Sequence, residues 1–109
     1  MSEVDVEDSR RRIDGGALLL DVRTAEEWEA GHVEGSTWIP MAELVARRAE
    51  LPGDRELVVI CRSGGRSAKA TEALVKWGYH AANVAGGAQA WVSAGYPLVR
   101  DDGSPGVVD

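Results

Sequence analysis

The chain has 109 residues, of which 44% are hydrophobic and 28% are charged, and these values fit one soluble globular domain with a single core. Its formal net charge of −6 argues against a general nucleic-acid binder. No apolar stretch is long enough to span a membrane, and the acidic N-terminus lacks the apolar core of a signal peptide. A lone cysteine excludes an internal disulfide and is consistent with a reducing compartment, most simply the cytoplasm.

Short apolar runs alternate with helical patterns along most of the chain. We expect strands at Val4 and over residues 17–22, 37–39, 56–60 and 83–84, and helices over residues 5–13, 24–30, 41–48, 67–77 and 88–93. Strands that alternate with helices predict an α/β fold with a mostly parallel five-stranded central sheet. Residues 1–99 are expected to form a single domain, and the polar, Gly/Pro-rich residues 100–109 are expected to form a flexible tail.

The cysteine, Cys61, ends the fourth of these strands and is followed by a cationic loop, Arg62-Ser63-Gly64-Gly65-Arg66-Ser67, and then by a helix. In open α/β sheets, ligands bind beyond the carboxyl ends of the strands, which is where this cysteine lies. Backbone N–H groups of a tight loop and a helix N-terminus favour an anion, and nearby guanidinium groups add positive charge. We therefore expect the thiol pKa to be lowered from about 8.5 into the range of about 3.5–7.5.

Glycine and arginine each have a candidate role in this loop. Gly64 and Gly65 allow positive φ angles and a close approach of backbone N–H groups to a ligand. Arg62 and Arg66 offer positive charge and forked donors for an oxyanion. The alternative interpretation is that Cys61 is a small buried apolar residue and that both arginines are solvated. Two Gly, two Arg and two Ser in six positions favour the functional interpretation.

The sequence is less specific about the roles of the loop serines and of the two histidines. Ser63 is a candidate donor to a bound anion, and Ser67 either donates in the same way or caps the following helix. His32 is expected to pin its loop by hydrogen bonding, and His80 is expected at the surface. A thiolate that is already ionised needs no general base. Two isolated histidines and one cysteine give no spacing for a metal site, so we expect neither a metal nor another cofactor.

Three groups of residues follow one another in a specific order. The first is Leu19-Leu20-Asp21-Val22-Arg23, Glu26-Glu27-Trp28, Gly31-His32-Val33-Glu34-Gly35-Ser36 and Ile39-Pro40. The second is the loop from Cys61 to Ser67, and the third is Gly78-Tyr79, Val84, Gly86-Gly87, Trp91 and Gly95-Tyr96-Pro97. Together they resemble the signatures of the rhodanese family and cover about Ala17 to Leu98, nearly the whole chain.

The resemblance implies a rhodanese-like three-layer fold, with helices on both faces of the sheet, and a thiosulfate sulfurtransferase. In that family the cysteine, here Cys61, attacks the outer sulfur of thiosulfate, releases sulfite and holds a persulfide. Backbone N–H groups of residues 62–67 would cradle the sulfur, and the loop arginines would bind the anionic donor. Asp21 and Arg23 would support the loop from the neighbouring strand. Because the chain has no second cysteine, a thiophilic acceptor such as cyanide, a small thiol or a protein thiol must come from outside.

Other functions share parts of this pattern. A sulfur carrier for cofactor or tRNA thiolation would have the same site. A phosphatase or arsenate reductase is disfavoured, because four residues separate Cys61 from Arg66 and related phosphatases have a longer cradle, of about five. The intact cysteine loop disfavours a non-catalytic interaction module. We expect a monomer or a weak dimer.

Overall fold

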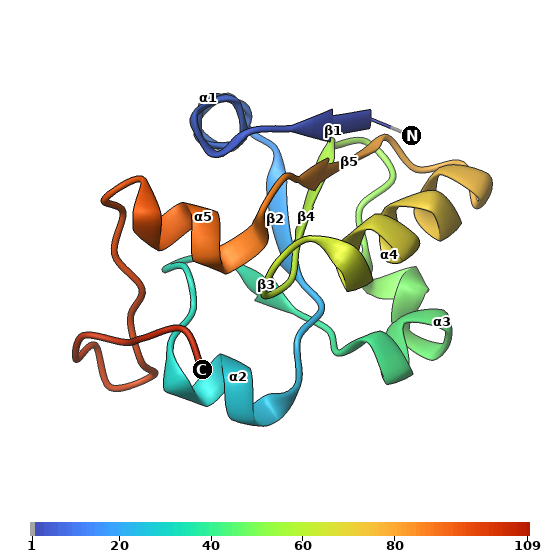
Figure 1. The fold of residues 1–109 in the computed structure, drawn as a ribbon. Coiled ribbons are helices and arrows are strands. Elements are labelled where there is room, and N and C mark those ends of the chain that lie inside the picture. Colours follow the sequence, from blue (N-terminus) through green and yellow to red (C-terminus); the bar gives the residue numbers. More distant parts are fainter. Residues whose placement is uncertain (1) are drawn as a thin grey trace.

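The computed structural model describes residues 2–109 and shows a five-stranded sheet between helices (Figure 1). The strands are β1 (Ser2–Val4), β2 (Leu18–Asp21), β3 (Thr37–Trp38), β4 (Leu57–Ile60) and β5 (Ala81–Val84), in the spatial order β1-β5-β4-β2-β3. The helices are α1 (Val6–Asp14), α2 (Ala25–Ala30), α3 (Leu44–Arg47), α4 (Gly65–Lys76) and α5 (Gly87–Ser93). All four strand pairings are parallel, so the predicted α/β fold is confirmed.

Side chains of the central strand β4 alternate between two apolar cores. Val58 and Ile60 belong to the core that contains residues of α1 and α5. Leu57, Val59 and Cys61 belong to the core on the opposite face, which contains residues of α3 and α4. Both faces of the strand are therefore covered, which explains its uninterrupted apolar sequence. The same alternation places Cys61 on the face of the sheet that α4 covers.

The sequence predicts helix caps at two positions, a Thr-x-x-Glu capping box at Thr24 and Glu27 and an aspartate cap at Asp5 or Asp8, and the structure contains both a capping box and an aspartate cap. The Thr24 hydroxyl accepts a hydrogen bond from the Glu27 N–H, and the Glu27 carboxylate accepts one from the Thr24 N–H, so a complete capping box begins α2. At the start of α1, the Asp5 carboxylate accepts a hydrogen bond from the Asp8 N–H. These caps depend on residues three positions apart, which is why the sequence reveals them.

Two elements differ from their predicted extents. The helix expected over residues 41–48 consists of the 3-10 turn Met41–Glu43, the short α3 and the 3-10 turn Arg48–Glu50. Only Leu44 is buried in this segment, so little tertiary packing is available to regularise it. Strand β5 is longer than expected because Ala81 and Ala82 also pair with β4.

The tail beyond Val99 folds back onto the domain, whereas its composition predicted a flexible tail. His32 and Val99 exchange backbone hydrogen bonds of 2.9 and 2.8 Å. Further along, Gly106 packs so closely that a Cβ at this position would lie 2.6 Å from the Cα of Gly31. Two facing glycines allow this backbone contact, and composition does not reveal that they meet. No helix within residues 2–109 is long and apolar enough to cross a membrane.

Candidate active site

The sulfur of Cys61 lies at the first turn of α4, where two groups donate hydrogen bonds to it. The Gly64 N–H lies 3.0 Å from Sγ, and the Ser67 hydroxyl lies 3.2 Å from it. Gly64 has a φ angle of 106° and is the N-cap of α4, so the turn that aims its N–H at sulfur favours glycine. Cys61 is only 1% exposed, as the apolar interpretation expects, but its sulfur has the hydrogen-bond partners of a thiolate.

These contacts lower the pKa of the Cys61 thiol. Burial raises the pKa, but the hydrogen bond from the Ser67 hydroxyl and those from the backbone N–H groups of Ser67, Gly64 and Ser63 together outweigh it. The lowered pKa agrees in direction with the expectation from the sequence, and the pKa range of about 3.5–7.5 stays a prediction. The thiolate is the reactive form of cysteine, so the site favours a nucleophile.

One of the two alternative roles of Ser67 and the positive φ angle expected of Gly65 are not observed. Ser67 does not cap the helix, because Gly64 is the N-cap and makes no side-chain capping bond; the Ser67 hydroxyl is directed to sulfur instead. Gly65 does not have a positive φ angle, because it is already the first residue of α4. Sequence alone could not place the helix start between these residues, since either glycine is compatible with a turn.

Replacing Ser67 with alanine is expected to raise the pKa of Cys61, because it removes a hydrogen bond to the thiolate, and a hydrogen bond to a charged group contributes roughly 1.5–3 kcal/mol. At pH values below both midpoints, the thiolate fraction would then fall. The pH dependence of the alkylation rate with iodoacetamide measures this midpoint. Ser63→Ala is the matched control, because the Ser63 contribution comes from its backbone N–H. An unshifted midpoint in Ser67→Ala would contradict the assigned contact.

The two loop arginines have different surroundings. Arg66 forms a two-pronged ion pair with Glu27, with Nη1–Oε1 and Nη2–Oε2 distances of 2.6 and 2.8 Å. Hydrogen bonding from Arg66, opposed by burial and supported by Thr24, lowers the pKa of Glu27 to about 2. Arg62 is exposed, and its Nε–H donates to the backbone carbonyl of Asp109 at 2.7 Å. From the sequence, both arginines were expected to bind the anionic sulfur donor, but in the structure both Nη atoms of Arg66 are paired with Glu27 of α2.

Asp21 and Arg23 form a buried ion pair at the end of β2. Arg23 Nη2 lies 2.8 Å from Asp21 Oδ2 and also donates to the Gly31 carbonyl at 2.7 Å. Both side chains are almost fully buried, with exposures of 2% and 1%. Within residues 2–109, neither side chain hydrogen-bonds the Cys61 loop directly. The pair reaches the end of α2, which in turn carries the partner of Arg66, so any support of the loop is indirect.

The N-terminus of α5 holds the backbone of the Cys61 loop. The Ala88 N–H donates to the Cys61 carbonyl at 2.8 Å, and the Gln89 N–H donates to the Arg62 carbonyl at 3.0 Å. Gly86 and Gly87 form a tight turn at the start of this helix, with φ angles of 77° and 58°. These donors of α5 are therefore used to position the loop.

Two residues that contact the site, Asn83 and Glu27, were not predicted from the sequence to do so. Asn83 is fully buried in β5, and its Nδ2 donates to the Gly64 carbonyl at 3.2 Å and to the Glu3 carboxylate at 3.1 Å. An asparagine inside the otherwise apolar Ala81-Ala82-Asn83-Val84 was the available signal. Glu27 was assigned only to the capping box, and nothing in the local pattern reveals its second role as the partner of Arg66.

The two histidines behave as predicted. His32 Nδ1 lies 2.9 Å from the carbonyl oxygen of Trp28, and the imidazole stacks on the Trp28 ring with centroids 3.6 Å apart. This contact pins the segment between α2 and β3. His80 is exposed at the other edge of the sheet, where it precedes β5.

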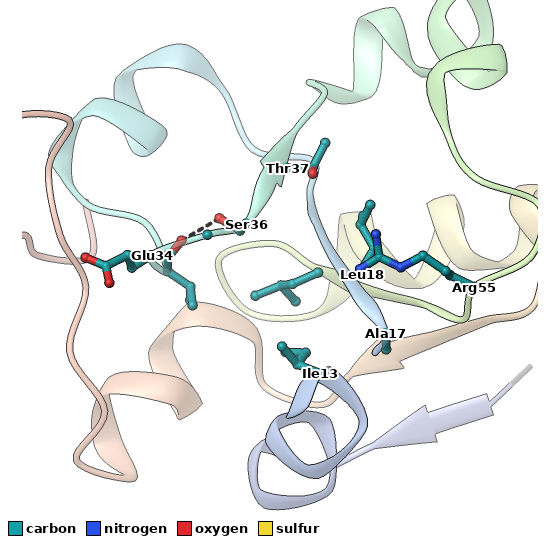
Figure 2. Close-up of a pocket in the computed structure, with 10 residues that line it drawn as sticks. Ile13, Ala17, Leu18, Glu34, Ser36, Thr37 and Arg55 are labelled. Atoms are coloured by element: carbon teal, nitrogen blue, oxygen red, sulfur yellow. Dashed lines mark hydrogen bonds between the residues drawn. The ribbon is translucent and has the colours of Figure 1, made fainter. Parts of the chain in front are cut away.

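A cavity of about 240 Å³ lies away from Cys61, at the edge of the sheet where β2 begins (Figure 2). Its lining includes Ala17, Leu18, Thr37 and Arg55, which precede or begin strands. Cys61 follows the opposite end of β4, and a four-residue strand separates the two edges by roughly 13 Å. The cavity contains no cysteine or histidine and does not contribute to the chemistry at the thiol.

The profile of the Rhodanese-like domain family matches residues 5–94. The chain belongs to this family. A sulfurtransferase from Allochromatium vinosum is 36% identical to this rhodanese-like chain, over 94% of the chain and 99% of the relative. Thiosulfate sulfurtransferase 18 from Arabidopsis thaliana is 33% identical, over 94% of the chain and 86% of the relative. These likenesses support sulfur transfer in general.

A solved structure confirms the rhodanese-like fold. The rhodanese-related protein from Thermoplasma volcanium superposes with a TM-score of 0.86 at 35% identity, covering 91% of this chain and 98% of that one. Other curated relatives are longer, and the chain spans about half of their length or less. The domain therefore matches both compact proteins of its own size and parts of larger proteins.

Proposed function

We propose that this rhodanese-like domain takes a sulfane sulfur from thiosulfate, or from another persulfide donor, and passes it through a Cys61 persulfide to a thiophilic acceptor such as cyanide or a thiol. The observation that carries the proposal is the Cys61 sulfur itself, which accepts hydrogen bonds from the Gly64 N–H and the Ser67 hydroxyl at the start of α4. The sulfurtransferase names of two relatives that match almost the whole chain support it.

The surroundings of Cys61 suit both halves of such a transfer. In the first half, the thiolate attacks the outer sulfur of thiosulfate, a new S–S bond forms, and the old S–S bond breaks with its electron pair leaving on sulfite. In the second half, the acceptor attacks the outer sulfur of the persulfide and the Cys61 thiolate is released. A persulfide is also an anion, so the N–H groups that stabilise the thiolate stabilise the intermediate as well.

Exposure of the protein to thiosulfate is expected to add one sulfur atom to Cys61. Intact-mass spectrometry of the wild-type chain measures this gain, which Cys61→Ala should not show. Addition of cyanide should then remove the extra sulfur and yield thiocyanate. If no sulfane donor adds sulfur to the wild-type chain, the proposed function is wrong and the family membership alone stands.

A further inference from the structure

We propose that Glu27 determines the charge preference of this site, and that its pairing with Arg66 shifts the preference from the dianion thiosulfate toward sulfur donors with a single negative charge. The inference rests on the proposed sulfur transfer and concerns which class of donor serves it best. It assigns to Glu27 a role beyond the capping of α2.

The ion pair with Glu27 engages both Nη atoms of Arg66, which would otherwise be available to bind an oxyanion. Both Nη atoms of Arg66 donate to Glu27, one to each carboxylate oxygen, at 2.6 and 2.8 Å. This forked arrangement is the one in which arginine binds the oxyanions of a ligand. A sulfonate group of a donor would therefore have to compete with Glu27 for it.

Glu27 is held where it is by a second set of contacts. Its Oε1 accepts hydrogen bonds from the Thr24 N–H at 3.0 Å and from the Thr24 hydroxyl at 3.1 Å. Its side chain is only 12% exposed, whereas that of Arg66 is 38% exposed. The carboxylate is consequently fixed at the start of α2 and stays charged at neutral pH, so a donor does not displace it easily.

Of the two loop arginines, only Arg62 is free of a side-chain ion pair within residues 2–109. The charge of Arg66 is opposed by that of Glu27, whereas Arg62 donates its Nε–H only to the main-chain oxygen of Asp109. The attacking Cys61 thiolate is itself negative. The charges of Arg62 and the thiolate therefore already balance before a donor binds. A donor with one negative charge adds one uncompensated charge to the site, whereas a dianion adds two.

The test compares two donors that react in the same way and differ in charge. Thiosulfate carries two negative charges and benzenethiosulfonate carries one, and each delivers a sulfane sulfur bound to a sulfonyl group. With cyanide as the acceptor, Glu27→Gln is expected to raise the ratio of kcat/KM for thiosulfate to kcat/KM for benzenethiosulfonate about three- to tenfold at low ionic strength. Near 1 M salt, where charges are screened beyond about 3 Å, the increase should largely disappear.

The variants separate this role from folding effects. Glutamine also serves at the third helical position of a capping box, so Glu27→Gln should retain α2 and the melting temperature checks this. Glu29→Gln is the matched control, since it removes the same charge from an exposed position of the same helix and has no contact with Arg66. It should leave the ratio unchanged.

Each result decides the proposal. An increased ratio in Glu27→Gln but not in Glu29→Gln supports it. A ratio that is unchanged overturns it, and a lowered ratio would show that Glu27 instead orients Arg66 toward the donor. If intact mass shows that neither donor loads sulfur on Cys61, the proposed function itself fails, which is distinct from sulfur loading with an unaltered ratio.

Discussion

Replacing Gly87 with alanine is expected to destabilise the protein by about 3 kcal/mol or more and to remove most of its sulfur loading. A Cβ at this position would lie 2.4 Å from the carbonyl oxygen of Cys61, and the φ angle of 58° is unfavourable for any residue with a side chain. Overpacking and a left-handed backbone each cost roughly 1–3 kcal/mol. Thermal unfolding should show a melting temperature lower by roughly 10–20 °C.

Sulfur loading of Cys61 is expected to fall because the added Cβ would displace the start of α5 from the Cys61 loop. Relief of the clash moves the start of α5 away from the Cys61 loop, and the hydrogen bonds from Ala88 and Gln89 to the loop carbonyls are lost. The N–H groups that face sulfur then lose their alignment. Gly53→Ala provides the control, because nothing lies within 4 Å of a Cβ there and its backbone is not left-handed. Similar melting temperatures for the two variants would contradict the close packing of Gly87.

Replacing Asp21 with asparagine is expected to be the second large effect, with a loss of about 3–5 kcal/mol in the free energy of unfolding. The change leaves the Arg23 guanidinium, which is 1% exposed, without its countercharge inside the protein. A buried charge that loses its partner is far more costly than an exposed one. The midpoint of urea denaturation measures the loss.

A second ion pair of this protein supplies the comparison. Arg47 and Glu50 lie 2.9 Å apart, but their side chains are 36% and 57% exposed. Water and salt screen such a pair, so Glu50→Gln should leave the urea midpoint essentially unchanged. If Asp21→Asn were as mild as Glu50→Gln, the buried pair would not be an important element of the fold.

The central features of the site were predictable because they depend on neighbouring residues. An apolar run of strand length, Cys61, a glycine-containing loop and a helical pattern follow one another directly, so the carboxyl edge of the sheet was the expected location. The lowered thiol pKa follows from the same order, since a helix N-terminus supplies N–H groups wherever it begins. The capping box at Thr24 was equally local.

The surroundings of the loop could not be predicted in the same way. Glu27 and Arg66 are 39 positions apart, and Asn83 is 19 positions from the glycine whose carbonyl it contacts. These contacts exist because the sheet order places β4 between β5 and β2. Local patterns carry no information about strand order. The sequence therefore predicted that Arg66 binds the sulfur donor and that Glu27 only caps α2.

By itself, the sequence determined the α/β class, the position of Cys61 beyond the end of a central strand and the direction in which its loop shifts the thiol pKa, because period, composition and local turns encode these properties. Only the tertiary structure decided which loop arginine is held in an ion pair, which glycine admits no side chain and how the C-terminal tail meets the domain. Those properties arise from distances between segments that are remote in the chain, and only the packed fold brings the segments together.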